Sequence, residues 1–173
     1  MKLDDRCRPI ELILSDVDGV LTGGEIVLDN RGIESKQFHI RDGLGVRLWQ
    51  RAGGRFGIVT SRSSHVVELR AAELSIDLVR QGMSDKLPVV REIMADLRVE
   101  PAQVAFIGDD LPDLAVIELV GLGVAVADAC PELRDAAPLV TTAPGGHGAV
   151  REAIERILKA QNRWDDLMQA YRL

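Results

Sequence analysis

Residues 10–22 read IELILSDVDGVLT, an apolar run that ends in two aspartates, Asp16 and Asp18, followed by Gly19. A near-continuous apolar run of this length is typical of a strand buried on both faces of a parallel sheet. In open sheets of this kind, ligands bind beyond the carboxyl ends of the strands. The stretch therefore predicts both a sheet and the edge at which functional residues gather.

Three further apolar runs extend the predicted sheet: RFGIVT at residues 55–60, VAFIG at residues 104–108 and LGVAV at residues 122–126. Helical patterns lie between and after them, with apolar stripes formed by Leu87, Val90, Met94 and Leu97, and by Val150, Ile154, Ile157 and Leu158. This alternation predicts a doubly wound, Rossmann-like α/β domain over residues 1–173.

One segment departs from the alternation. Residues 25–40, EIVLDNRGIESKQFHI, contain two short strand-like pieces around the turn sequence DNRG. They predict a β-hairpin that projects from the sheet after the first strand, followed by a helix over residues 42–52. The polar stretch 162–173 is expected to be a last helical turn or a tail.

The composition limits the classes of function. The chain has 173 residues, of which 46% are apolar and 28% charged, and its formal net charge of −6 argues against nucleic acid as a partner. No apolar run is long enough for a signal peptide or a membrane span. Cys7 and Cys130 lie outside any zinc-ligand spacing, so free thiols in a reducing cytoplasm are expected.

Acidic residues follow two of the predicted strands. Asp16 and Asp18 follow the first, and the sequence GDDLPD places Asp109, Asp110 and Asp113 after the strand at residues 104–108. Carboxylates that converge on one edge repel each other unless a cation lies between them. Oxygen ligands select a hard cation, and Mg²⁺ is the usual one in phosphate chemistry.

The residues between these acids suit phosphoryl transfer. A carboxylate such as Asp16 can attack phosphorus, and a second one two residues on can protonate the leaving oxygen and later activate water. A hydroxyl and an ammonium group can hold the remaining phosphoryl oxygens, and Thr60 and Lys86 fit these roles.

DVDGVLT, the strand that ends at Thr60, Lys86 and GDDLPD resemble the four motifs of the haloacid dehalogenase superfamily, in their usual order. The resemblance implies that Asp16 is the nucleophile and Asp18 the general acid and base, while Thr60 and Lys86 bind the phosphoryl group.

The same resemblance implies the metal site. Mg²⁺ would be bound by Asp16, Asp109 and the backbone carbonyl of Asp18, with Asp110 and Asp113 in its outer shell. GxxxxGK[ST], the phosphate-binding loop of another class of nucleotide hydrolase, does not occur in the sequence.

Over residues 10–160 the chain is similar to the 3-deoxy-D-manno-octulosonate 8-phosphate phosphatases, a capless branch of that superfamily. This implies a sugar-acid phosphate as the small-molecule substrate, a place in lipopolysaccharide biosynthesis, and binding of the substrate by Thr60, Ser61, Arg62 and Lys86. The branch usually has Thr-Gly-Arg where this chain has Ser61 in the middle, and Gly-Gly-Arg-Gly where it has His147. His147 is expected either to contact the sugar acid or to lie exposed in its loop.

The segments between the motifs are too short for a cap domain. An uncapped site is open to water unless a second subunit covers it. The resemblance implies a homotetramer in which hairpins associate, and the apolar residues of segment 25–40 suit such burial.

Three alternatives remain open at this point. Nonulosonate 9-phosphate phosphatases are similar, although Arg62 favours the octulosonate enzymes. The chain could also be a non-catalytic oligomerisation module like the tails of cytidylyltransferases, which the intact acids and Lys86 oppose. A phosphoryl-accepting receiver domain shares the acidic edge, but its acids are adjacent rather than spaced as DxD.

Overall fold

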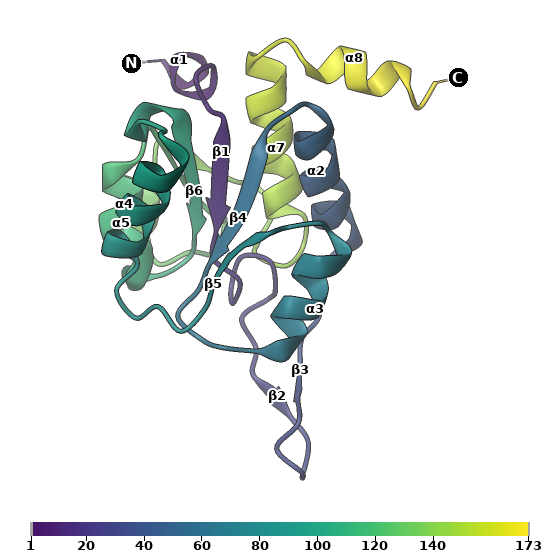
Figure 1. The fold of residues 1–173 in the computed structure, drawn as a ribbon, viewed down its shortest axis with the longest axis vertical. Helices are drawn as coiled ribbons and strands as arrows, with labels where there is room; N and C mark the ends of the chain where they lie inside the picture. Colours follow the sequence, from purple (N-terminus) through teal and green to yellow (C-terminus); the bar gives the residue numbers. More distant parts are fainter. Residues whose placement is uncertain (1, 173) are drawn as a thin grey trace.

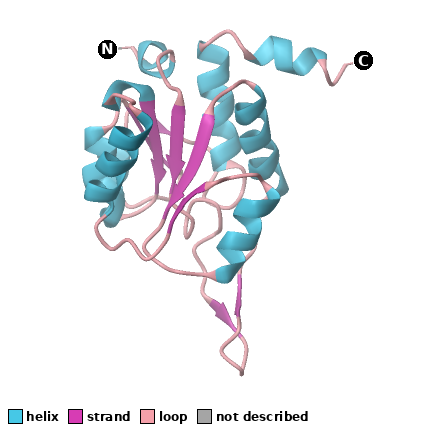
Figure 2. Ribbon diagram, viewed as in Figure 1, coloured by secondary structure: helices cyan, strands magenta, loops and turns pink. Residues whose placement is uncertain are grey.

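The structure is a computed structural model that describes residues 2–172. Its centre is a six-stranded, all-parallel sheet in the order β5-β4-β1-β6-β7-β8, with helices on both faces (Figures 1 and 2). The strands are β1 Leu12–Ser15, β4 Arg55–Val59, β5 Leu78–Arg80, β6 Val104–Gly108, β7 Leu122–Ala125 and β8 Leu139–Val140. The predicted doubly wound α/β fold is therefore confirmed.

The four predicted apolar runs all form strands of the sheet. They fill its centre and are buried almost throughout, as a sheet covered on both faces requires. The first strand is shifted from the predicted residues 10–14 to Leu12–Ser15, and neither β5 nor β8 was predicted. Both unpredicted strands are short and lie at the edges of the sheet, where partial exposure removes the apolar signal.

Helices cover the two faces of the sheet. In Figure 1, α4 and α5 lie to the left of the strands, and α2, α3 and α7 lie to the right. The helices are α1 Leu3–Cys7, α2 Ile40–Arg51, α3 His65–Glu73, α4 Lys86–Leu97, α5 Leu114–Leu119, α6 Pro131–Ala136, α7 Ala149–Ala160 and α8 Trp164–Gln169, with short 3₁₀ helices at η1 Pro101–Gln103 and η2 Leu111–Asp113.

Both predicted apolar stripes lie in helices. The stripe of α7 is fully buried, and α7 packs against α2. In α4, Val90 and Met94 are buried, while Leu87 and Leu97 are partly buried against the same core. The helix predicted over residues 42–52 begins earlier, at Ile40, because the His39 side chain caps it by accepting a hydrogen bond from the Arg41 amide.

The predicted hairpin is present. Strands β2 (Val27–Leu28) and β3 (Glu34–Ser35) pair antiparallel, and Asp29 closes the turn by accepting hydrogen bonds from the amides of Arg31 and Ile33. The hairpin projects from the carboxyl-end edge of the sheet, away from both termini (Figure 1). Four of its apolar side chains are exposed, those of Ile26, Val27, Leu28 and Ile33, whereas Phe38 is partly buried against the core.

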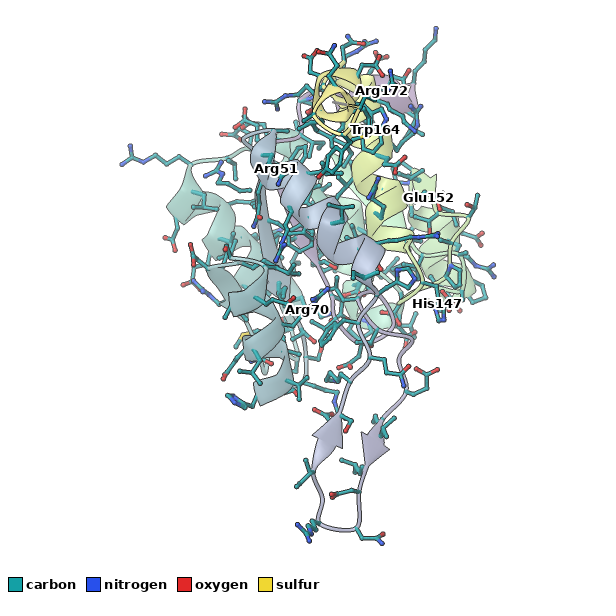
Figure 3. All side chains as sticks on the ribbon, turned by 90° about the vertical axis from the view of Figure 1, so that its right-hand side faces the viewer. Arg51, Arg70, His147, Glu152, Trp164 and Arg172 are labelled. Carbon is teal, nitrogen blue, oxygen red and sulfur yellow. The ribbon has the colours of Figure 1, made fainter. Side chains whose placement is uncertain are left out.

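The segments between the motifs leave no room for a cap. Among the described residues, the hairpin and α2 fill the segment between β1 and β4. The segment between Lys86 and β6 is filled by α4 and η1. The described helices include none that is long and apolar enough to span a membrane. The C-terminal stretch forms α8, which begins at Trp164 (Figure 3), and the Trp164 ring centroid lies 5.3 Å from Arg151 Cζ and 5.2 Å from Lys159 Nζ.

Candidate active site

The central residues of the site follow three neighbouring strands, β4, β1 and β6. Parallel pairing places Ser15 of β1 opposite Ile58 of β4 and Ile107 of β6. Asp16, Thr60 and Asp109, which directly follow or nearly follow these positions, therefore emerge at the same carboxyl edge. The register of β1 with β4 and β6 therefore brings the motifs to one edge of the sheet, as predicted.

Lys86 links two of the carboxylates. It is the first residue of α4, and its side chain is buried, with Nζ lying 2.6 Å from Asp16 Oδ2 and 2.6 Å from Asp113 Oδ1. Burial alone would lower the pKa of Lys86, but the carboxylates of Asp113 and Asp16 outweigh it and raise the pKa above its ordinary value. The amine therefore stays charged where a phosphoryl group would approach Asp16.

The carboxylates of Asp16, Asp109 and Asp113 each place an oxygen within 4.8 Å of the others. We call these residues, with Lys86, the inner cluster. Burial, then the charges of Asp16 and Asp113, raise the pKa of Asp109 to about 7. Within residues 2–172, Asp109 makes no ion pair, so the cluster has more negative charge than Lys86 balances. An all-oxygen donor set with an uncompensated charge fits Mg²⁺.

The loop after β1 passes close to the Asp109 carboxylate. Gly19 has a φ of +87°, and a Cβ there would lie 2.0 Å from Asp109 Oδ2. Only glycine accepts both the backbone conformation and the contact. The Asp16 carboxylate is oriented on its other side by the Val17 amide, which donates a 2.6 Å hydrogen bond to Oδ1.

Asp113 and Asp110, which were both expected in the outer shell of the metal, lie in different surroundings. Asp113 is buried and accepts hydrogen bonds from Lys86 and from the Asp109 amide. Asp110 is exposed, and its carboxylate caps η2 by accepting from the Leu111 amide. The implied outer-shell role therefore has no geometric support for Asp110, whereas Asp113 lies among the possible ligands themselves.

The side chain of Asp18 points toward the base of the hairpin. It pairs with Lys36, and its Oδ2 lies 3.7 Å from Arg62 Nε. Arg62 and Lys36 both contact Glu34 Oε1, at 2.6 Å and 3.5 Å respectively. Two carboxylates and two cations thus alternate in a closed set of contacts, which we call the ion-pair ring: Asp18, Lys36, Glu34 and Arg62.

The ring joins three segments that are distant in sequence. Asp18 belongs to the loop after β1, Glu34 and Lys36 to the hairpin, and Arg62 to the loop after β4. A hydrogen bond from the Ser64 side chain, then the guanidinium of Arg62, hold the pKa of Glu34 below its usual range. Neither Glu34 nor Lys36 belongs to a sequence motif, so no local pattern predicted that they contact Asp18 and Arg62.

The remaining predicted substrate residues directly follow β4. Thr60 is buried at the end of β4, whereas Ser61 and Arg62 are exposed. The Arg62 guanidinium is already paired with Glu34, to whose Oε1 its Nη2 donates a 2.6 Å hydrogen bond. Ser61 lies between Thr60 and Arg62 in the sequence, in the same loop after β4.

The GGHG loop packs on the loop after β1. A Cβ on Gly145 would lie 1.8 Å from the Gly19 carbonyl oxygen, and the Gly146 amide donates to the Val20 carbonyl at 2.8 Å. His147 is exposed, with Nδ1 2.7 Å from the Gly145 carbonyl oxygen, and lies near the base of the hairpin (Figure 3). His147 is thus an exposed loop residue, and its contact with the sugar acid stays a prediction.

Comparisons with known proteins agree with this geometry. The family model described as haloacid dehalogenase-like hydrolase matches residues 59–154. The 3-deoxy-D-manno-octulosonate 8-phosphate phosphatase of Yersinia pestis is 46% identical over 91% of this chain and 84% of its own length. The enzyme of the same name from Escherichia coli K12 is 45% identical over 93% of this chain and 86% of its own length.

The chain belongs to the 3-deoxy-D-manno-octulosonate 8-phosphate phosphatase family of haloacid dehalogenase-like hydrolases. It is accordingly a phosphoric monoester hydrolase. A crystal structure of the family's Moraxella catarrhalis member, in complex with a magnesium ion, a phosphate ion and a KDO molecule, is 40% identical, covers 97% of each chain and superposes with a TM-score of 0.96.

Proposed function

We propose that this chain hydrolyses 3-deoxy-D-manno-octulosonate 8-phosphate through a phosphorylated Asp16. The observation that carries the proposal is the inner cluster, in which Asp16 is held between the Val17 amide and Lys86 and lies beside two further carboxylates. For this purpose residues 1–173 act as one catalytic domain.

In the first step, an Asp16 carboxylate oxygen forms a bond to phosphorus as the bond from phosphorus to the sugar oxygen breaks. Asp18 donates a proton to the leaving sugar oxygen. In the second step Asp18 takes a proton from a water molecule, which attacks phosphorus and releases Asp16 as a carboxylate. Lys86 and the hydroxyl of Thr60 hold the phosphoryl oxygens during both steps.

Asp16, Asp109 and Asp113 would hold Mg²⁺, together with the backbone carbonyl of Asp18. The ion supplies positive charge that reduces the repulsion between the nucleophile and the phosphate. The three carboxylates that need such charge belong to the same cluster that Lys86 only partly neutralises.

The sugar acid's carboxylate would lie at the mouth of the site, next to Ser61 and Arg62. A guanidinium can bind a carboxylate through two parallel hydrogen bonds, which suits Arg62 to this task. Because the Arg62 guanidinium already donates a hydrogen bond to Glu34, substrate binding would replace the Glu34 carboxylate with that of the sugar acid.

We further propose a homotetramer in the cytoplasm. The exposed apolar residues of the hairpin, at 49% to 58% exposure, would be buried between chains. Free Cys7 and Cys130 suit a reducing compartment. Light scattering on the purified protein tests the assembly, and an active, selective monomer at working concentrations would contradict it.

A turnover screen with Mg²⁺ tests the substrate. Octulosonate 8-phosphate, a nonulosonate 9-phosphate and simple hexose phosphates are compared by kcat/KM. We expect the octulosonate to exceed the simple phosphates by at least about a hundredfold, since a lost hydrogen bond to a charged group costs about 1.5–3 kcal/mol and several such contacts would be lost. A preference for the nonulosonate would assign the chain to that substrate instead.

A further inference from the structure

The ion-pair ring contains an ammonium group in an unusual position. The Lys36 side chain is only 1% exposed, yet it comes from a hairpin that otherwise projects into solvent. Burial of an ammonium is unfavourable unless it is paired, and here both of its partners are carboxylates, of Asp18 and Glu34. Lys36 is therefore a buried, paired lysine next to Asp18 rather than a surface lysine.

Lys36 is the nearer of the two cations at Asp18. It contacts Oδ1, whereas the half-exposed Arg62 approaches Oδ2 at 3.7 Å. The Asp18 side chain is outside the group of carboxylates that could hold a metal ion. Among the described residues, its charged contacts are these two cations alone, so Lys36 is the main determinant of where its carboxylate points.

We infer that Lys36 is a positioning residue that holds the Asp18 carboxylate in the orientation needed to activate water, an inference that rests on the proposed function. Asp18 sits on a loop, where Lys36 contacts Oδ1 and Oδ2 faces Arg62 at 3.7 Å. Glu34 completes the arrangement, because it contacts Lys36 and Arg62 through the same oxygen. The hairpin thereby takes part in the chemistry of its own chain, in addition to any role between chains.

The two chemical steps depend on Asp18 to different extents. When the leaving group is an aryl oxide, it departs without a proton, so attack by Asp16 hardly needs Asp18. Hydrolysis of the phosphorylated Asp16 needs Asp18 whatever the first leaving group was. Loss of Lys36 should therefore slow the second step selectively, and the phosphoenzyme should accumulate.

The test uses the full chain with Mg²⁺ and p-nitrophenyl phosphate. We expect Lys36→Met, which keeps the side-chain volume, to lower kcat by about tenfold to a hundredfold, as loss of a supporting contact typically does. Its kcat/KM, which reports the first step, should stay within a few-fold of wild type. The steady-state fraction of phosphoenzyme, trapped by rapid acid quench, should rise.

Two further variants act as controls. Lys36→Arg keeps the charge and should recover most of kcat. Lys159→Met makes the same substitution at an exposed lysine of α7, outside the ring and the hairpin, and should leave all three quantities unchanged.

Each other result contradicts the inference in a recognisable way. Equal losses of kcat and kcat/KM without phosphoenzyme would show that Lys36 serves only the fold. A loss confined to kcat/KM would show that it binds substrate. Unchanged kinetics would show that Asp18 needs no such support. A wild-type protein that turns over without any phosphoenzyme would overturn the proposed function itself, and this inference with it.

Discussion

The inner cluster and the ion-pair ring are both groups of carboxylates and cations, but they differ in composition and setting. The inner cluster is buried at the strand ends and has three carboxylates for one lysine. The ring is partly exposed at the base of the hairpin and balances two carboxylates with two cations. The uncompensated cluster is suited to bind a metal ion and to attack phosphate, whereas the neutral ring is suited to orient Asp18 and meet the sugar.

The largest effect is expected from Asp16→Asn in the inner cluster. An amide cannot attack phosphorus, so kcat should fall by at least about a thousandfold while the fold is retained. Turnover with saturating Mg²⁺ and circular dichroism measure the two quantities. Asp96→Asn, an exposed change on α4, serves as the control, and full activity of Asp16→Asn would refute the mechanism.

Lys86→Met should destabilise the metal-free protein. It leaves the carboxylates of Asp16 and Asp113 without their buried cation, and breaking a buried pair in this way costs about 3–5 kcal/mol. Urea unfolding gives the free energy of unfolding. Lys159→Met, which breaks an exposed pair, should cost less than about 1 kcal/mol, and similar losses in both variants would remove the distinction between buried and surface pairs.

Mg²⁺ should stabilise the protein through the inner cluster. At a concentration about a hundredfold above its Kd, the ion should raise the free energy of unfolding by about 2.7 kcal/mol, and excess chelator should abolish hydrolysis. Asp109→Asn should lose most of this gain, while Asp110→Asn should keep it because Asp110 faces away. Equal gains in the two variants, or full activity in EDTA, would contradict the assigned site.

The smallest expected effect concerns Arg62 in the ring. Arg62→Ala should lower kcat/KM for the sugar acid phosphate by about tenfold to a hundredfold, since it removes a charged hydrogen-bond donor. The loss on p-nitrophenyl phosphate, which has no carboxylate, should be much smaller. Equal losses on both substrates would mean that Arg62 serves Asp18 or the fold rather than the sugar.

The same contrast explains what could be predicted from sequence. The inner cluster follows from short motifs at the ends of apolar strands. Because the carboxyl ends of parallel strands lie at one edge of the sheet, the motifs could be brought together without knowledge of side-chain packing. The ring depends on how a projecting hairpin folds back on the loop after β1, which no local pattern of Glu34 or Lys36 reveals.

Two smaller departures have similar causes. The turn at η2 directs Asp113 inward and Asp110 outward, which the sequence GDDLPD alone did not distinguish, since both were expected in the outer shell of the metal. The edge strands β5 and β8 are too short and too exposed to show an apolar run.

The central claim is that Asp16 carries the phosphoryl group, and trapping that intermediate tests it most directly. Asp18→Asn, which retains the nucleophile but lacks the water-activating base, is mixed with Mg²⁺ and p-nitrophenyl phosphate, whose leaving group needs no proton from Asp18, and is quenched in acid. Peptide mass spectrometry should then find phosphate on Asp16, and none when the doubly substituted Asp16→Asn, Asp18→Asn protein is treated in the same way. Phosphate on another residue, or turnover by the wild type with no phosphorylated peptide at any time, would contradict the claim.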